Sequence, residues 1–287
     1  MRSVPLALLV SLLVGCGGEA PPPPPPASAP APAPAPAPAP EPPAPPTGRA
    51  LLVASEFGLS PLACFLDAGK QFASGADCLA LAPTGTEVWL MSGGAAKVVG
   101  RAVANCPNAA TPEPTLTIDA PPDALRGDAV VPASLKEALV YVTPAVPADV
   151  DRDTPKELRG RIAEAVRAAA PELKTIKVRV DQRVSVDLDG DGAGEDMVAV
   201  VVPGDPKDDE ANFRFSGFFL VPRAGAPVLL RSRADTRERY ALLGAIDLDG
   251  DGARELYLNT YGDDGFSLSL ESRGKGGLET LGRWSCS

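Results

Sequence analysis

The chain alternates between short apolar runs and polar turns, and most of the runs show the two-residue period of β-strands. From about residue 174 this pattern repeats. The first copy consists of IKVRVDQRVSV, an acidic loop, MVAVVV, FRFSGFFLV and PVLLRSR. The second copy consists of RYALLGAI, a second acidic loop, LYLNTYG, FSLSLES and LETLGRW. The pattern predicts a pair of antiparallel meanders, each with four short strands like a propeller blade.

Residues 48–150 also read as β-rich, but without the repeat. The runs RALLVAS, CLALAP, TEVWLMS and KVVGRAV are bounded by glycine and polar turns, which predicts strands. Residues 106–125 are rich in proline and are predicted to form a loop or an internal boundary. After them, SLKEALVYVTPAV predicts a short helical turn that leads into a strand.

The clearest helix of the sequence begins at Thr154. Thr154 is the predicted N-cap, Pro155 the first helical residue, and Glu157 completes a capping box with the threonine. Pro171 ends the helix. Apolar residues recur at helical spacing and form one face, which we expect to pack on a sheet: Leu158, Ile162, Val166 and Ala169. The predicted fold class is α+β, mostly antiparallel β, with one main helix at about residues 155–170.

The N-terminus has the features of a secretory signal. In MRSVPLALLVSLLVGC, Arg2 precedes an apolar run that is shorter than the roughly 20 residues needed to span a membrane. Its end, LVGC at residues 13–16, resembles the lipobox of bacterial lipoproteins. That resemblance implies cleavage before Cys16, acylation of this residue with chains such as palmitate, and stable membrane anchoring. Gly17 follows in place of the aspartate of inner-membrane lipoproteins, which implies the outer membrane, with the protein facing either the periplasm or the outside. An ordinary signal peptide beside a chance cysteine is the alternative.

A proline- and alanine-rich segment, residues 21–46, separates this signal from the foldable part of the chain. Because proline fixes φ and lacks an amide donor, the segment can join neither a helix nor a sheet ladder. We expect an extended spacer of about 3.1 Å per residue. The predicted organisation is a signal peptide (1–15), a lipidated N-terminus with a disordered linker (16–47), a β-rich N-terminal domain (48–150) and the helix with two β repeats (151–287).

The chain has five cysteines, an odd number for an exported protein. If Cys16 carries the lipid, the others form an even set: Cys64, Cys78, Cys106 and Cys286. The oxidising conditions outside the cytoplasm predict that these four form two structural disulfides. Several pairings are possible, and the spacing does not choose among them.

Composition excludes several classes of function. The net charge is −10, and no basic stripe is concentrated along the chain, so we expect no nucleic-acid partner. The chain contains no histidine, which rules out Ser-His-Asp and Cys-His catalysis and removes the usual zinc ligand. An enzyme with this composition would depend on carboxylates, lysine, tyrosine or serine.

The most distinctive chemistry lies in the acidic loops, VDLDGDGAGED at 186–196 and IDLDGDGAREL at 246–256. Carboxylates this close repel one another unless a cation lies among them, and oxygen-only ligation suits a hard cation such as Ca²⁺. Gly192 and Gly252 stand at the sixth position, where a calcium loop turns sharply. We therefore predict two structural Ca²⁺ sites. The predicted ligands, with a backbone carbonyl from each alanine, are Asp187, Asp189, Asp191, Ala193, Glu195, Asp247, Asp249, Asp251, Ala253 and Glu255.

These loops differ from the EF-hand, which has a glutamate at position twelve and flanking helices. Val198 and Leu258 occupy that position, and predicted strands flank both loops. The loops resemble instead the calcium loops of FG-GAP (integrin-α-like) β-propeller repeats, over about residues 175–287. The resemblance implies blade-like repeats held by calcium, with Glu at the ninth position in place of the commoner Asp. Residues 48–150 then form either degenerate blades or a different fold. The alternative interpretation of the loops is that they are acidic turns without a metal ion.

Together these features predict a membrane-anchored envelope lipoprotein with a calcium-stabilised extracytoplasmic β domain. Its expected role is structural or binding rather than enzymatic, and the sequence does not specify a protein or glycan partner. The alternative is a carboxylate-based cell-surface hydrolase, in which two carboxylates outside the loops face each other across a cleft. The tripeptide RGD at 126–128 resembles an integrin-binding motif, but matches of this length arise often by chance.

Overall fold

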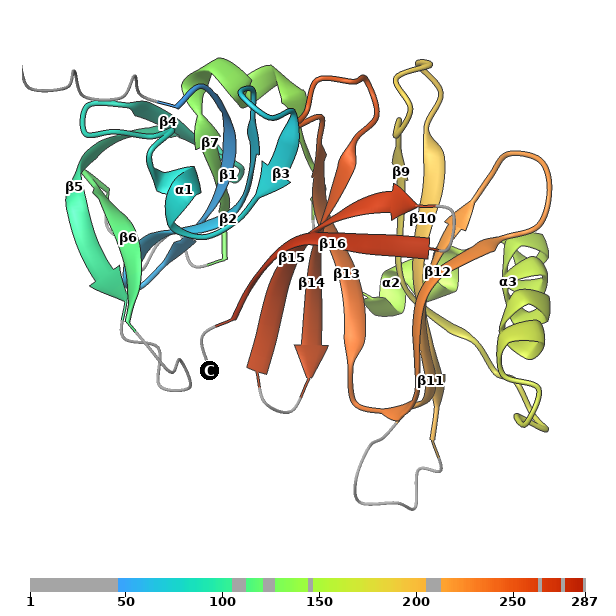
Figure 1. The fold of residues 1–287 in the computed structure, drawn as a ribbon. Coiled ribbons are helices and arrows are strands. Elements are labelled where there is room, and N and C mark those ends of the chain that lie inside the picture. The colour runs from blue at the N-terminus through green and yellow to red at the C-terminus, as the bar shows by residue number, and fades with distance from the viewer. Residues whose placement is uncertain are drawn as a thin grey trace, which may run out of the picture. The chain divides into compact units, whose positions relative to one another are not determined.

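The N-terminal strands close into a six-stranded barrel (Figure 1). Its strands are β1 (Gly48–Ser55), β2 (Gly58–Leu66), β4 (Glu87–Leu90), β5 (Ala95–Ala104), β6 (Glu113–Ile118) and β7 (Ala129–Pro132). The order around the barrel is β1, β7, β4, β5, β6 and β2. The ring closes because β2 runs antiparallel to β1 along its whole length, while Leu52 and Val53 of β1 also pair with β7. A short strand, β3 (Gln71–Ala73), extends one edge of β2.

The structure is a computed structural model, and it describes residues 46–104, 112–120, 127–143, 147–204, 213–262, 265–274 and 277–285. By its internal contacts, the chain from Ala44 to Ser287 is a unit separate from Met1–Pro43. Several sequence predictions concern residues outside the described ranges: the signal sequence, Cys16 and almost all of the proline-rich spacer, together with Cys106 and Cys286.

Two segments of the barrel differ from the sequence prediction. The run CLALAP, predicted as a strand, contributes instead to the helix α1 (Ala76–Leu79) and the turns after it. The proline-rich segment predicted as a loop contains β6, whose Leu116 is buried in the barrel core. Pro114 is tolerated in this strand because β2 pairs with β6 only at Leu116, which leaves the rest of that edge without ladder hydrogen bonds.

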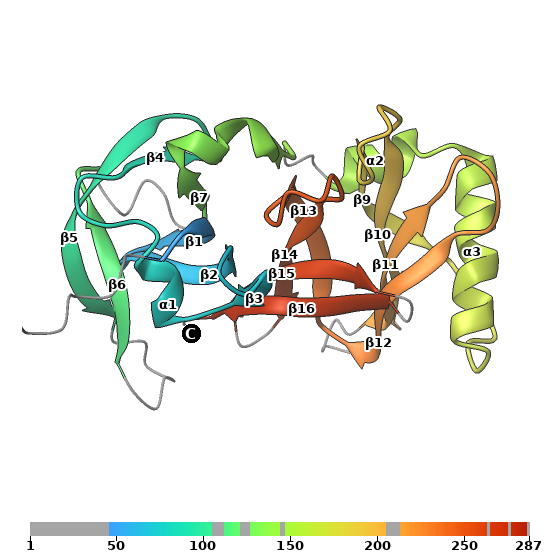
Figure 2. The ribbon, with the colours of Figure 1, turned by 45° about the horizontal axis from the view of Figure 1, so that its top comes forward.

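The two predicted meanders are present as antiparallel sheets whose strands follow one another in sequence order (Figures 1 and 2). The first contains β9 (Arg179–Val186), β10 (Glu195–Pro203), β11 (Phe213–Val221) and β12 (Val228–Thr236). The second contains β13 (Arg239–Ile246), β14 (Glu255–Gly262), β15 (Gly265–Gly274) and β16 (Gly277–Trp284). The predicted helical turn and strand before them are also present, as the 3₁₀ helix η2 (Ala133–Ala138) and β8 (Leu139–Tyr141). The strand β8 pairs with β13 and so extends the second meander.

The main helix, α3, spans Lys156–Ala169, as the sequence predicts to within a residue. Its buried face follows the predicted spacing at Leu158, Ile162 and Val166. Ala169 is exposed, however, and the neighbouring Ala170 takes the fourth buried position just after the helix ends. No helix within the described ranges is long and apolar enough to cross a membrane.

Thr154 does not cap this helix, so the predicted capping box is wrong. A second helix, α2 (Pro147–Asp153), ends directly before Thr154, whose hydroxyl donates a hydrogen bond to the carbonyl of Val150 at 2.7 Å. The N-cap position of α3 is Pro155, and no side chain caps that end. The threonine therefore bonds back to α2, a helix that the sequence pattern does not reveal.

The barrel, the two meanders and α3 pack on one another through common hydrophobic cores, because several strands are covered on both faces. In β10, Val198 packs with α3, whereas the adjacent Met197 packs with the second meander. In β14, Leu258 packs with the first meander, whereas Tyr257 packs with the outer face of the barrel. Strands that are buried on both faces read as nearly continuous apolar runs, which explains segments such as MVAVVV.

Candidate metal centre in two acidic loops

The acidic loops join the first and second strands of each meander. Loop 1, residues 187–194, connects β9 to β10, and loop 2, residues 247–254, connects β13 to β14. The glutamates at the ninth position, Glu195 and Glu255, begin the second strand and pair with the last residue of the first strand in both sheets. The two loops therefore occupy the same place in two copies of one arrangement.

The backbone of each loop folds around its own carboxylates. In loop 1, the carboxylate of Asp187 accepts hydrogen bonds from the amides of Gly190 and Gly192, at 2.8 and 3.2 Å. Asp189 and Asp191 each accept one from the amide two residues later, at 3.3 and 2.7 Å. Loop 2 repeats all four of these bonds at donor–acceptor distances of 2.7–3.2 Å. The carboxylates are thus held in place by the local backbone.

Glycine permits the sharp turn that this bonding requires. The sixth-position residues Gly192 and Gly252 have φ angles of 82° and 92°, in the left-handed region where a side chain is disfavoured. The fourth-position residues Gly190 and Gly250 turn the same way, with φ angles of 74° and 79°. The turn predicted at position six is therefore present in both loops.

A leucine at the second position anchors each loop in a different core. Leu188 is fully buried in the core between the two meanders, and Leu248 is fully buried in the core between the second meander and the barrel. Full burial of a leucine side chain contributes about 1.5–3 kcal/mol to stability. Each acidic loop consequently lies at a junction between two layers of the fold.

The structure brings together part of each predicted ligand set. The carboxylate oxygens that lie within 4.8 Å of one another are those of Asp187, Asp189 and Glu195 in loop 1 and those of Asp247, Asp249 and Asp251 in loop 2. Asp191 and Glu255 lie outside these clusters, and a ligand role for the carbonyls of Ala193 and Ala253 stays a prediction. A cluster of carboxylate oxygens suits Ca²⁺, which completes its shell of about 6–8 oxygens with carbonyls and water. The donor set of each loop therefore fits a hard divalent cation.

The two glutamates support the loops from the strand side. Glu195 and Glu255 each accept a hydrogen bond, at 2.9 Å, from the amide of the second-position leucine of their loop. Glu255 is only 5% exposed. Burial removes water from its carboxylate and raises its pKa to about 7, and the nearby negative charge of Asp249 adds to this shift. Loop 2 thus resists the ionisation of its own glutamate unless positive charge enters the loop.

The two loops contact each other directly. The backbone amide of Arg254 in loop 2 donates a hydrogen bond to the carbonyl of Leu188 in loop 1, at 2.8 Å. The guanidinium of Arg254 donates to the carbonyl of Asp187, and its Nη1 lies 3.7 Å from the Oδ2 atom of the same aspartate. A Cβ on Gly190 would lie 2.9 Å from the carbonyl oxygen of Gly252, so only glycine fits at this contact.

Arginines from other strands bond to the carbonyls of the anchoring leucines. Arg273 of β15 donates to Leu188 at 3.3 Å, and Arg49 of the barrel strand β1 donates to Leu248 at 3.2 Å. The loop motif alone does not predict either arginine, because both come from distant parts of the sequence. The one arginine near the loops that lies within the motif itself is Arg254, at the eighth position of loop 2, where loop 1 has glycine.

Of the four cysteines predicted to form disulfides, Cys64 and Cys78 are joined, with their Cα atoms 5.4 Å apart. This disulfide links β2 to α1 within the barrel core. Cys106 and Cys286 lie outside the described ranges, so a disulfide between them stays a prediction.

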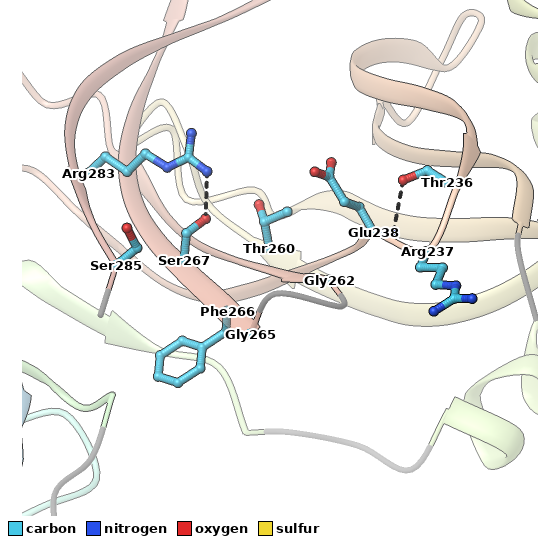
Figure 3. A pocket seen from close by; sticks show the side chains of 10 residues that line it. All are labelled: Thr236, Arg237, Glu238, Thr260, Gly262, Gly265, Phe266, Ser267, Arg283 and Ser285. Carbon is cyan, nitrogen blue, oxygen red and sulfur yellow. Dashed lines mark hydrogen bonds between the residues drawn. The ribbon is translucent and has the colours of Figure 1, made fainter. Parts of the chain in front are cut away.

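A separate polar pocket of about 370 Å³ lies at one end of the second meander (Figure 3). Its lining residues are Thr236, Arg237, Glu238, Thr260, Gly262, Gly265, Phe266, Ser267, Arg283 and Ser285. Figure 3 shows Arg283 donating to the hydroxyl of Ser267, at 3.1 Å. Glu238 is the one carboxylate among these lining residues, so they do not provide the pair of facing carboxylates that the hydrolase hypothesis requires.

Comparison with known proteins identifies no relative: no family model matches the chain, and neither the curated proteins nor the solved structures contain a match.

Proposed function

We propose that the protein is a membrane-anchored envelope lipoprotein whose β domain is stabilised by two calcium ions and has a structural or binding role. One observation carries the calcium part: both meanders cluster three carboxylates at the equivalent hairpin, at positions one, three and nine of the first motif and one, three and five of the second, with the same backbone hydrogen bonds. A simple turn does not require several carboxylates at alternate positions, and here the arrangement occurs in two copies. In this proposal the meanders are blade-like repeats similar to those of FG-GAP proteins.

The calcium ions have a structural part in this proposal. The clustered carboxylates of each loop would hold one ion, whose charge offsets the repulsion among them. Because Leu188 and Leu248 anchor the loops between layers, a rigid loop also stabilises the junction beside it. The expected consequence is a β domain that withstands the conditions outside the cytoplasm better when calcium is bound.

Calorimetric titration tests the calcium part. After treatment with a chelator and its removal, the full chain in detergent should bind two calcium ions. Asp189→Asn should remove one of the two binding events and Asp249→Asn the other, because each aspartate belongs to a different cluster. A chain that binds no calcium under these conditions would contradict this part of the proposal.

The anchor part rests on the lipobox-like residues 13–16 and on the spacer that follows them. Mass spectrometry of the mature protein from a bacterial envelope fraction tests it. We expect an N-terminal Cys16 that carries a diacylglyceryl group and a further acyl chain. An unmodified Cys16, or cleavage at another residue, would refute the anchor and leave the calcium proposal standing.

The geometry favours this role over the carboxylate-based hydrolase. Within the described ranges, Glu157 and Asp196 both line a pocket of about 410 Å³ beside α3. Asp196, however, forms an ion pair with Arg183 at 2.9 Å. The carboxylate of Asp196 is therefore engaged by an arginine and does not form a free acid–base pair with Glu157.

A further inference from the structure

We propose that Arg254 is a built-in counter-ion for loop 1, so that loop 1 binds a divalent cation more weakly than loop 2 and fills after it. This inference rests on the proposed function, because it assumes that both loops bind cations. The inference concerns Arg254 of loop 2, whose charge acts on loop 1. The calcium-loop motif by itself does not include an arginine with this role.

The position of Arg254 is fixed by contacts to loop 1. Its backbone amide bonds to the carbonyl of Leu188 at 2.8 Å, and its guanidinium bonds to the carbonyl of Asp187. Its Nη1 lies 3.7 Å from Oδ2 of Asp187, with 23% of the arginine side chain and 27% of the aspartate side chain exposed. A partly buried charge pair of this kind is screened less by salt than a surface pair.

This contact places a positive charge beside a carboxylate of the loop 1 cluster. Asp187 belongs to that cluster, and a cation bound there would lie close to the guanidinium. The arginine therefore partly neutralises loop 1 in the absence of metal and repels a divalent ion that enters it. The Nε atom of Arg254 is buried and has no hydrogen-bond partner among the described residues, so one donor of the guanidinium is left unsatisfied.

Among the described residues, loop 2 has no corresponding ion pair with a cluster carboxylate. The guanidinium of Arg49 lies against Gly250, but it bonds to the carbonyl of Leu248, as Arg273 bonds to the carbonyl of Leu188 at loop 1. Within the described ranges, no lysine or arginine forms an ion pair with the clustered aspartates of loop 2, which are Asp247, Asp249 and Asp251. The two loops thus have the same backbone and different charge environments, which predicts unequal affinities.

Calorimetric titration of the full chain in detergent with Ca²⁺ tests the inference. The native chain should show two sites of unequal affinity, with the weaker one lost in Asp189→Asn and the stronger one lost in Asp249→Asn. Arg254→Gln should tighten the weaker site by about tenfold, the size expected when one charge is removed from beside a divalent ion under water-like screening. Arg254→Lys should keep the weak site, because it retains the charge and changes the hydrogen bonds.

Arg273→Gln is the matched control, because Arg273 bonds to the carbonyl of Leu188 and, among the described residues, forms no ion pair with a carboxylate of loop 1. It should leave both affinities within about twofold of the native values. Equal affinities in the native chain, or an unchanged or weakened loop 1 site in Arg254→Gln, would overturn the inference while the calcium proposal stands. A native chain and an Arg254→Gln variant that both bind no calcium would refute the proposed function and this inference together.

Discussion

The guanidinium of Arg49, on the first strand of the barrel, donates a hydrogen bond to the carbonyl of Leu248 in loop 2, at 3.2 Å. The two residues are 199 positions apart in the sequence. This bond joins the barrel to the acidic loop of the second meander, beside the core in which Leu51, Val53 and Leu248 are buried together. The junction therefore combines apolar packing with a charge-assisted hydrogen bond.

Loss of this bond should destabilise the protein. We expect Arg49→Gln to lower the free energy of unfolding by about 1–2 kcal/mol, because a hydrogen bond from a charged donor is lost at a partly buried site. Urea denaturation measures the change. The control is Arg101→Gln on the exposed side of β5, which should change stability by less than about 0.5 kcal/mol. Equal effects of the two substitutions would show that the contact with Leu248 contributes nothing.

The anchoring leucines should have a larger effect. Leu248→Ala removes a fully buried side chain from the core between the barrel and the second meander, so we expect a loss of about 2–5 kcal/mol. Val99→Ala is the control, because Val99 is 52% exposed and should tolerate the change. Chemical denaturation in the presence of a chelator compares the two variants without any contribution from metal binding. A loss below about 1 kcal/mol for Leu248→Ala would contradict the assigned anchoring role.

The contact between the two loops can be tested with a pair of glycine substitutions. Gly190 and Gly192 have similar left-handed φ angles, so alanine at either position should cost about 1 kcal/mol in backbone strain. Only at Gly190 would the new Cβ also lie 2.9 Å from the carbonyl of Gly252, whereas nothing lies within 4 Å at Gly192. We expect Gly190→Ala to be the more destabilising by at least about 1 kcal/mol in denaturation with a chelator present. The same loss for both variants would mean that the loops separate at little cost.

The raised pKa of Glu255 predicts how the stability of the metal-free protein depends on pH. Burial raises its pKa from 4.5 to about 7, so the folded protein holds this proton more tightly than the unfolded chain does. Folding then takes up a proton between these two values, and the contribution of Glu255 to stability falls as the pH rises through this window. In a chelator, the melting temperature of the native chain minus that of Glu255→Gln should therefore fall between pH 5 and pH 8. A difference between the two proteins that is independent of pH would contradict the raised pKa.

The meanders were predictable from the sequence because their strands are neighbours along the chain. The two-residue period and the acidic loops mark each hairpin locally, and the helix near Leu158 shows its own spacing. The barrel was not predictable in this way. Its closure depends on pairing between β1 and β7, whose partners Leu52 and Val130 are far apart in the sequence, and no local pattern encodes that distance.

The candidate site was predictable to a similar extent. Asp187 and Asp247 could be assigned to clusters because the spacing within one short loop brings carboxylates together. The arginines that surround the loops could not be assigned, since Arg49 and Arg273 reach them through the tertiary fold. Arg254 lies inside the second motif, but its effect on the first loop depends on the contact between the two meanders.

The most direct test of the central claim is the melting temperature of the full chain in detergent, measured by calorimetry in calcium and again in EDTA. Calcium at about 100 times its Kd should stabilise each site by about 2.7 kcal/mol, which predicts a rise of roughly 5–10 °C per occupied loop. A chain with both Asp187→Asn and Asp247→Asn should melt in calcium near the temperature of the native chain in EDTA. The same melting temperature for the native chain in calcium and in EDTA would contradict the account.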